Sequence, residues 1–110
     1  MYETFLKYLP QSELVIMSGL PLPGRTVFWK DTAAINQFLA AFARSDPRLH
    51  YMEAADVMTS AQGPENLNMG NGRYFNASFF RMDQIHLNKA GHDVWTARIK
   101  ETLRELGILP

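Results

Sequence analysis

Cysteine is absent from this chain of 110 residues, and the other features that it lacks exclude several classes of protein. Without cysteine the chain can form no disulfide, no thiolate metal site and no cysteine nucleophile. Eleven basic residues balance eleven acidic ones, and neither sign forms a run of five or more. A chain without excess charge gives no reason to expect a nucleic acid or an anionic membrane surface as partner.

Long hydrophobic runs are missing as well. No apolar stretch approaches the roughly 18 residues that a membrane span requires. The opening residues, MYETFLKYLP, do not show the basic region and apolar region of an export signal. We therefore expect no membrane span and, by default, a cytoplasmic location.

The composition is that of an ordinary folded protein, with 46% hydrophobic and 20% charged residues. A chain of this length has room for one small domain, so we expect residues 1–110 to share one core. A domain of this size buries about two-thirds of its unfolded surface, which leaves little stability in reserve. A large uncovered apolar face is therefore unfavourable.

The N-terminal part predicts a helix and then a buried strand. Apolar residues recur at helical spacing over residues 2–9, and Pro10 ends that pattern. The next segment, ELVIMSGLPLP (residues 13–23), is a continuous apolar run of strand length. It lacks the alternation of a half-exposed strand, as is typical of strands buried on both faces of a parallel sheet.

A second helix and a second strand follow. Asp31 is a good N-cap for a helix that continues to Asp46, and a short strand is expected from Leu49 to Glu53. A strand, helix and strand in this order pair their strands in parallel. The apolar face expected for the helix consists of Ile35, Phe38, Leu39 and Phe42.

The C-terminal part predicts a long loop and a third helix. Residues 60–76 are rich in Gly, Asn and Pro, with a tight turn expected at Asn71-Gly72. Loops of this length are usually functional or mobile. Asn88 is a good N-cap for a helix over residues 89–106, which Gly107 ends. The buried face expected for this helix consists of Trp95, Ile99, Leu103 and Leu106.

These elements indicate an α/β fold with parallel strands and helices on both faces. Two strands and three helices leave sheet edges and an apolar face uncovered, and such surfaces associate. We therefore expect a homo-oligomer in which edges pair or apolar faces stack.

The stretch RMDQIHLNKAGH (residues 81–92) carries the strongest chemical signal. A histidine acts as a general base only when its tautomer and orientation are fixed, commonly by a carboxylate on Nδ1. Asp83 lies three positions before His86, which suits this pairing in a turn that enters a helix. The same spacing is also compatible with an aspartate that only caps the backbone beside a surface histidine.

The longer string FFRMDQIHLNKAGHDVWTARIKETL resembles the last conserved block of the SGNH hydrolases, the family of GDSL lipases and esterases. The strand segment ELVIMSGLPLPGR and the segment NGRYFNASFF are similar to earlier pieces of the same family. The resemblance covers almost the whole chain, from Tyr2 to Ile108. It implies the C-terminal half of a flavodoxin-like, three-layer α/β/α domain.

The resemblance also implies roles for the aspartate and the histidine. In the family, the histidine that matches His86 takes the proton of a serine that attacks an ester or thioester carbonyl. The aspartate that matches Asp83 stabilises the imidazolium. The family's Gly-Asp-Ser block and its oxyanion-hole blocks have no counterpart among these residues. None of the five serines follows Gly-Asp, and Ser18, before Gly19, matches a later strand than the nucleophile's.

Two further residues are candidates for substrate binding. Arg25, after the segment PLPG, suits a carboxylate or a phosphate, although a loop arginine more often pairs with a nearby acid. Trp29 is a candidate for the wall of an acyl pocket, or for simple packing under a loop. His86, His92 and Asp93 are conceivable metal ligands, but their spacing matches no common zinc motif. We expect no metal and no cofactor.

Two hypotheses therefore stay open. In the first, the chain is an SGNH-type segment that supplies the Asp-x-x-His part of a site for an ester or acyl substrate. It is inactive alone, because the nucleophile must come from another segment. In the second, the chain is a non-catalytic module that keeps the scaffold for assembly or binding.

Overall fold

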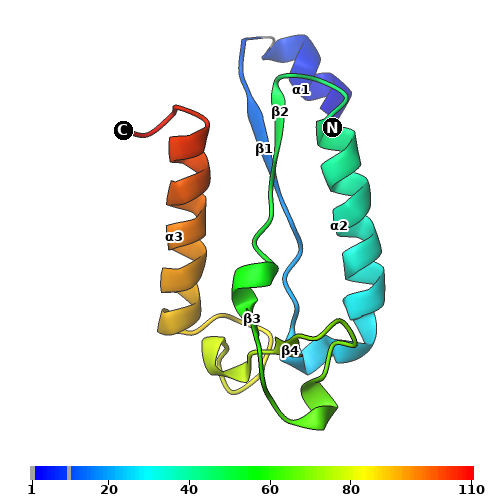
Figure 1. Ribbon diagram of the computed structural model, residues 1–110. Helices are drawn as coiled ribbons and strands as arrows, with labels where there is room; N and C mark the ends of the chain where they lie inside the picture. Colours follow the sequence, from blue (N-terminus) through cyan, green and yellow to red (C-terminus); the bar gives the residue numbers. More distant parts are fainter. Residues whose placement is uncertain (1, 10) are drawn as a thin grey trace.

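The computed structural model describes residues 2–9 and 11–110, and it places short strands between helices (Figure 1). The expected end of the first helix at Pro10 lies outside the described residues. Short 3₁₀ turns connect the longer elements. The helices and strands are α1 (Tyr2–Tyr8), β1 (Leu14–Met17), α2 (Trp29–Ala43), β2 (Leu49–Met52), β3 (Thr59–Ser60), β4 (Tyr74–Phe75) and α3 (Lys89–Glu105).

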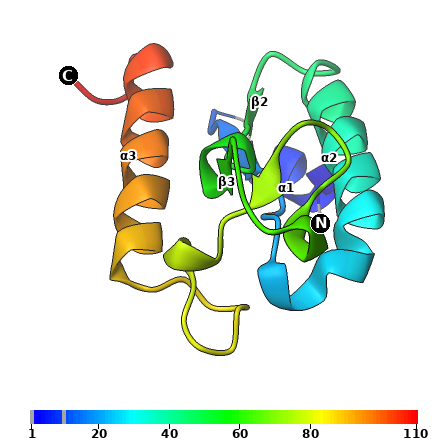
Figure 2. The same ribbon diagram turned by 60° about the horizontal axis from the view of Figure 1, so that its bottom comes forward.

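Two sheets of two strands each make this a mixed α/β protein. β1 and β2 are parallel, in a register that places Leu14 opposite Leu49 and Met17 opposite Met52. β3 and β4 are antiparallel. The expected strand, helix and strand unit is confirmed. Helices α2 and α3 lie on opposite sides of the parallel pair in both views (Figures 1 and 2).

A hydrogen-bonded clamp fixes α2 against the end of β1. The Gly19 N–H donates to Asn36 Oδ1 at 2.8 Å, and Asn36 Nδ2 donates to the Gly19 carbonyl at 3.1 Å. Asn36 is buried, so its amide needs these partners. A Cβ on Gly19 would lie 2.8 Å from Thr32 Cγ2, which shows how closely the helix approaches the strand.

Two expectations for α2 are wrong. The helix begins at Trp29 rather than after Asp31, because the 3₁₀ turn Pro23–Phe28 continues directly into it and leaves no extended cap residue. Its expected apolar face is only partly buried, since Leu39 and Phe42 are half-buried and the other two residues are largely exposed. Ile35 is 57% exposed and Phe38 is 66% exposed. The clamp directs Asn36 at the sheet, so Phe38 on the opposite side of the helix and Ile35 on one flank point away from it.

Helix α3 follows the sequence more closely. Asn88 is its N-cap and accepts a hydrogen bond from the Gly91 N–H, and Gly107 just beyond its end has a φ of 76°. Its first turns pack, through Val94 and Trp95, on the buried cluster formed by Met58, Phe80 and Leu87. The later residues of its expected buried face, Ile99, Leu103 and Leu106, are only half-buried.

The expected loop over residues 60–76 carries more structure than predicted, because β3 and β4 pair at its two ends. The tight turn is confirmed. Gly72 has a φ of 80°, and the Met69 N–H donates to the Arg73 carbonyl across the turn. In the described part of the chain, no helix is long and apolar enough to cross a membrane.

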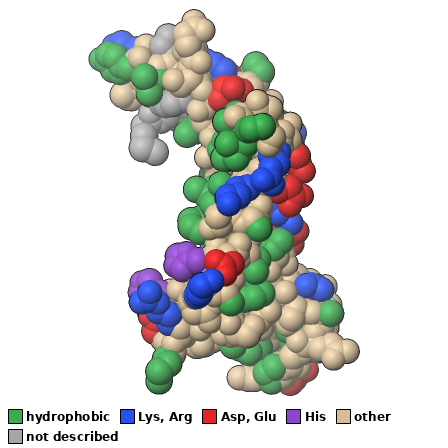
Figure 3. Space-filling model, turned by 90° about the vertical axis from the view of Figure 1, so that its left-hand side faces the viewer, with side chains coloured by type: hydrophobic (Ala, Val, Ile, Leu, Met, Phe, Trp, Pro, Cys, Tyr) green, Lys and Arg blue, Asp and Glu red, His purple; other side chains and the backbone are tan. Residues whose placement is uncertain are grey.

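The protein is more extended than its length requires. Its radius of gyration is 15.5 Å, whereas a compact domain of this length has about 13 Å. The space-filling view shows a tall column that is hollowed on one side, between two projecting ends (Figure 3). The molecule therefore exposes surface that a compact domain of this size would bury.

Candidate functional site

A tight turn presents Asp83 and His86. Phe80 and Leu87 form an antiparallel bridge, and the Arg81 N–H donates to the His86 carbonyl at 2.7 Å, which closes the loop between them. Within the loop Gln84 adopts a φ of 58°, a left-handed conformation that non-glycine residues rarely take. This geometry folds the chain back so that the two side chains meet.

Both oxygens of the Asp83 carboxylate are hydrogen-bonded. Oδ2 lies 2.6 Å from His86 Nδ1, and Oδ1 accepts from the backbone N–H groups of Ile85, at 2.9 Å, and His86, at 3.0 Å. The hydrogen bond from His86 is the main reason that the pKa of Asp83 lies well below its usual range, and the two backbone bonds lower it further. Asp83 is therefore a carboxylate over the whole physiological range of pH.

The pairing determines which ring nitrogen of His86 is available. With Nδ1 directed at a carboxylate, that nitrogen is the donor, so the neutral ring carries its lone pair on Nε2. The His86 side chain is 73% exposed. A group in solution or on another polypeptide can therefore reach Nε2, which is the arrangement that a general base requires. Asp83 caps the backbone and orients the histidine at the same time.

The segment after β1 rests on this turn. The Gly24 N–H donates to the Gln84 carbonyl at 2.8 Å, and a Cβ on Gly24 would lie 2.9 Å from the Asp83 carbonyl oxygen. Only glycine allows the chain at position 24 to lie this close to the turn without a shift of the backbone. The contact joins the carboxyl end of the parallel strand pair to the Asp83–His86 turn.

The structure brings Arg25 and Trp29 together at a small pocket. This pocket has a volume of about 270 Å³, and Leu20 and Phe28 also line it. The Arg25 guanidinium donates to the Gly24 carbonyl at 3.1 Å. Neither Asp83 nor His86 lines the pocket.

The serine hydroxyls for which the structure shows hydrogen bonds have partners other than His86. Ser78 donates to the side-chain oxygen of Asn76, and the others bond to backbone groups. Ser18 is buried, and its Oγ accepts from the Ala54 N–H at 2.9 Å. Ser45 donates to the Phe42 carbonyl, and Ser60 donates to the Gln62 carbonyl. None of these hydroxyls is hydrogen-bonded to His86. Ser18 in particular joins the ends of β1 and β2 and has a structural role.

Asn88 and Gly91 hold the start of α3 against the segment that precedes the Asp83–His86 turn. Asn88 Nδ2 donates to the carbonyls of Ser78, at 2.8 Å, and Phe80, at 3.1 Å, while its Oδ1 accepts from the Gly91 N–H. One side chain thus joins the segment before the turn to the start of α3. A Cβ on Gly91 would lie only 2.1 Å from the Phe79 carbonyl oxygen, so the helix can pack here only with glycine.

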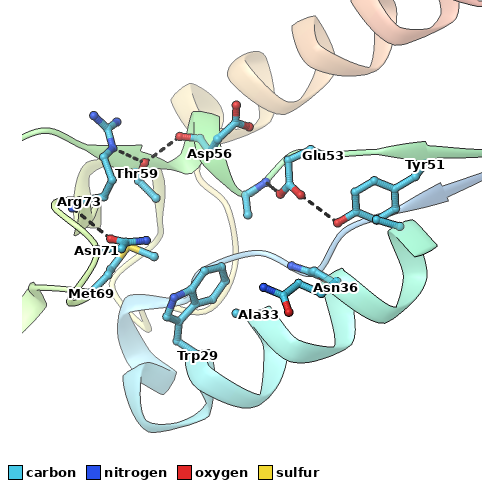
Figure 4. Close-up of a pocket in the computed structure, with 13 residues that line it drawn as sticks. Trp29, Ala33, Asn36, Tyr51, Glu53, Asp56, Thr59, Met69, Asn71 and Arg73 are labelled. Atoms are coloured by element: carbon cyan, nitrogen blue, oxygen red, sulfur yellow. Dashed lines mark hydrogen bonds between the residues drawn. The ribbon is translucent and has the colours of Figure 1, made fainter. Parts of the chain in front are cut away.

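A larger cleft lies between α2 and the segment that follows β2 (Figure 4). Its volume is about 570 Å³, within the range of small-molecule sites. Trp29 and Asn36 point into it from α2, and Met69 and Asn71 face them from the loop. The sequence indicated this region only through the length of the loop over residues 60–76. Lining residues that sequence reasoning missed are Tyr51, Glu53, Asp56, Asn71 and Arg73.

Tyr51 and Glu53 form a polar pair at the edge of this cleft. The Tyr51 hydroxyl donates to Glu53 Oε2 at 2.9 Å, and Glu53 Oε1 accepts from the Ala55 N–H at 3.1 Å. Burial, and then the hydrogen bond to Glu53, raise the pKa of Tyr51 to about 12. The hydroxyl is therefore a hydrogen-bond donor at neutral pH and not a base.

The residues considered as metal ligands have other contacts. Asp93 is paired with Lys89 at 2.9 Å, and the His92 ring lies 6.4 Å from that of Trp95. Among residues 2–9 and 11–110, no three His, Asp or Glu side chains are grouped closely enough to hold a metal ion.

No protein-family model, no curated protein and no solved structure matches the chain. Its function is therefore inferred from the arrangement of its own side chains.

Proposed function

We propose that the chain supplies the base half of an SGNH-type hydrolase site. In this proposal His86 accepts the proton of a nucleophilic serine that another polypeptide segment provides, and Asp83 stabilises the imidazolium that forms. The substrate class is an ester or thioester. The corresponding fold proposal is that the parallel pair β1 and β2, with α2 and α3 on either side, is part of a flavodoxin-like, three-layer domain.

The observation that carries the proposal is the hydrogen bond of 2.6 Å between Asp83 Oδ2 and His86 Nδ1. A carboxylate that only capped the backbone would not need to reach the ring. Here one oxygen caps the turn and the other orients the histidine, and both functions are fulfilled within four residues.

The chain is not expected to turn over esters by itself. The hydroxyls of Ser18, Ser45 and Ser60 are engaged in backbone hydrogen bonds, and that of Ser78 is bonded to the Asn76 side chain. An oxyanion-hole donor contributes roughly 3 to 4 kcal/mol to the stabilisation of a transition state, and loss of the nucleophile removes several further orders of magnitude in rate. An exposed histidine and its carboxylate alone cannot replace these groups.

The test is to express the chain together with the residues encoded in frame before Met1. The proposal predicts that this extension contains a Gly-Asp-Ser motif and that the extended protein hydrolyses p-nitrophenyl acetate. His86→Ala should reduce kcat by about 10³-fold or more. His92→Ala is the matched control, because His92 is exposed on α3 and does not contact Asp83. An extension without the motif, or activity that His86→Ala leaves unchanged, contradicts the proposal.

One observation favours the second candidate function, a non-catalytic module for assembly. Large apolar side chains of α2 are exposed, and neither cavity is lined by Asp83 or His86. A module of this kind would show no His86-dependent hydrolysis even when extended.

A further inference from the structure

Among residues 2–9 and 11–110, β1 has a strand beside it on one edge. In the described part of the chain it pairs with β2 alone, and its outer edge is open. The N–H groups of Leu14 and Ser18 donate to the carbonyls of Arg48 and Met52 in and beside β2. Backbone groups alternate in direction along a strand, so the N–H and C=O groups of Val15 and Met17 point away from β2. These four groups form an open hydrogen-bonding edge.

Within the strand itself, this edge lacks the features with which proteins protect exposed strands. Residues 14–22 contain no charged side chain, and the strand itself contains no proline. Lysine, proline and bulges are the usual protection. Charged residues flank both strands, Glu13 before β1 and Arg48 and Glu53 around β2. The outer edge of β2 differs, because Arg98 donates to the Glu53 carbonyl just beyond it at 2.7 Å. The exposed edge that can accept another strand is therefore that of β1.

The side of α2 nearest this edge is apolar. At 100° per residue, Ala33, Gln37 and Ala40 form the flank that faces the cleft beside β2. The opposite flank, on the β1 side, carries Ile35, Leu39 and Phe42, with Phe38 stacked on Phe42 at 6.3 Å between ring centroids. We call these four residues the α2 stripe.

Charge is absent from this helix over most of its length. No residue from Thr32 to Ala43 is charged, whereas a helix that faces water on one side normally carries charged residues there. Ile35 and Phe38 are nevertheless 57% and 66% exposed. A helix with this composition is typical of one that is covered on more than one side.

The amount of uncovered surface matches one side of a protein interface. The accessible surface is 7318 Å², whereas a compact monomer of 12.6 kDa exposes about 6,200 Å². The excess of roughly 1,100 Å² compares with the roughly 800 Å² that each partner buries in a standard interface. An excess of this size, taken over the whole molecule, is compatible with one contact of ordinary size.

We propose that in the chain of 110 residues the β1 edge and the α2 stripe together bind a second copy. This is the surface that the further strands of the proposed three-layer domain would occupy in an extended protein, so the proposal concerns the chain without such an extension. The two β1 strands pair antiparallel about a two-fold axis perpendicular to the sheet, which gives the strand order β2-β1-β1-β2 across the dimer. Such an axis keeps both α2 helices on the same face, so the two stripes meet over the new strand pair. Because neither surface carries charge, like charges do not oppose one another at the contact.

Light scattering coupled to gel filtration tests the proposal between about 1 and 100 µM. A mass of twice 12.6 kDa is expected at the higher concentrations. Ile35→Lys and Phe38→Lys should each raise the Kd about tenfold or more. Gln37→Lys is the matched control, because it places the same charge at an exposed position on the opposite flank of the same helix, and it should leave the Kd unchanged.

Amide hydrogen exchange tests the strand pairing without any substitution. At dimer concentrations, the N–H groups of Val15 and Met17 that form the new ladder should exchange more slowly than in the monomer. A monomer at all concentrations overturns the proposal and leaves the edge to a different polypeptide. A dimer in which Gln37→Lys weakens association as much as Ile35→Lys, or in which Val15 and Met17 gain no protection, overturns this mode of pairing.

Discussion

Two regions of this molecule, the Asp83–His86 turn and the flank beside β1, differ in how closely they are packed. The base of the Asp83–His86 turn is closely packed, since Asn88, Gly91 and Gly24 all contact neighbouring backbone there. The open flank, formed by the outer edge of β1 and the α2 stripe, has unpaired backbone groups and exposed apolar side chains. The comparison teaches that the turn with the proposed catalytic residues is held by local contacts, while the flank proposed to bind a second copy has few contacts within the chain.

The largest expected effect is at Gly91. A methyl group there would lie 2.1 Å from the Phe79 carbonyl oxygen, so Gly91→Ala should force α3 away from the turn. We expect a loss of about 3 kcal/mol or more in the free energy of unfolding, measured by urea denaturation. Ala90→Gly, one residue earlier and exposed, is the control and should cost about 1 kcal/mol or less. Equal effects at both positions would mean that this end is not closely packed.

Asn88 should give a smaller but still clear effect. Asn88→Ala removes the cap of α3 and the two hydrogen bonds to the carbonyls of Ser78 and Phe80, and we expect a loss of about 2 kcal/mol. Asn88→Ser keeps a capping oxygen and should lose about half as much. If serine and alanine are equally destabilising, the two hydrogen bonds to the carbonyls of Ser78 and Phe80, and not the cap, account for the loss.

Tyr51, at the edge of the cleft, should make the free energy of unfolding depend on pH. Its pKa of about 12 in the folded protein lies above the ordinary value of about 10. The folded state therefore keeps a proton that the unfolded state loses, so the stabilisation is fully present below about pH 10 and is lost as the pH rises through 12. Tyr51→Phe should flatten this decline in an unfolding series from pH 9 to 12. An unchanged profile would show that another group titrates there.

The smallest effect is expected on the open flank. Phe38 is 66% exposed, so Phe38→Ser should change the unfolding free energy of the monomer by less than about 0.5 kcal/mol. The measurement requires a protein concentration below the Kd of the proposed dimer. A loss as large as that at Asn88 would show that the flank is already covered within one chain, and the contrast between the two regions would disappear.

Much of the closely packed end could be predicted from the sequence, because its signals are local. The cap at Asn88, the stop at Gly107 and the turn at Gly72 each depend on a residue type with a specific backbone preference. The approach of Asp83 to His86 is compatible with their spacing, although spacing alone could not distinguish a capping aspartate from one that also binds the ring. The left-handed Gln84 had no sequence signal.

The open flank could not be predicted in the same way. Helical periodicity identified Ile35, Phe38, Leu39 and Phe42 as one apolar face, but it could not tell what covers that face. The orientation of α2 is set by the long-range bonds between Asn36 and Gly19, and a polar residue among apolar ones gave no indication of this contact. The cleft beside Tyr51 was missed for the same reason, since its walls are far apart in the sequence.

The most direct test of the proposed base is the proton position on His86. Long-range ¹H–¹⁵N NMR correlations distinguish a protonated ring nitrogen from one with a lone pair. The account predicts that the neutral ring carries its proton on Nδ1, toward Asp83, and its lone pair on Nε2, and that Asp83→Asn reduces this preference. A neutral His86 with its proton mainly on Nε2 in the unsubstituted protein would contradict the claim that Asp83 prepares this histidine to accept a proton.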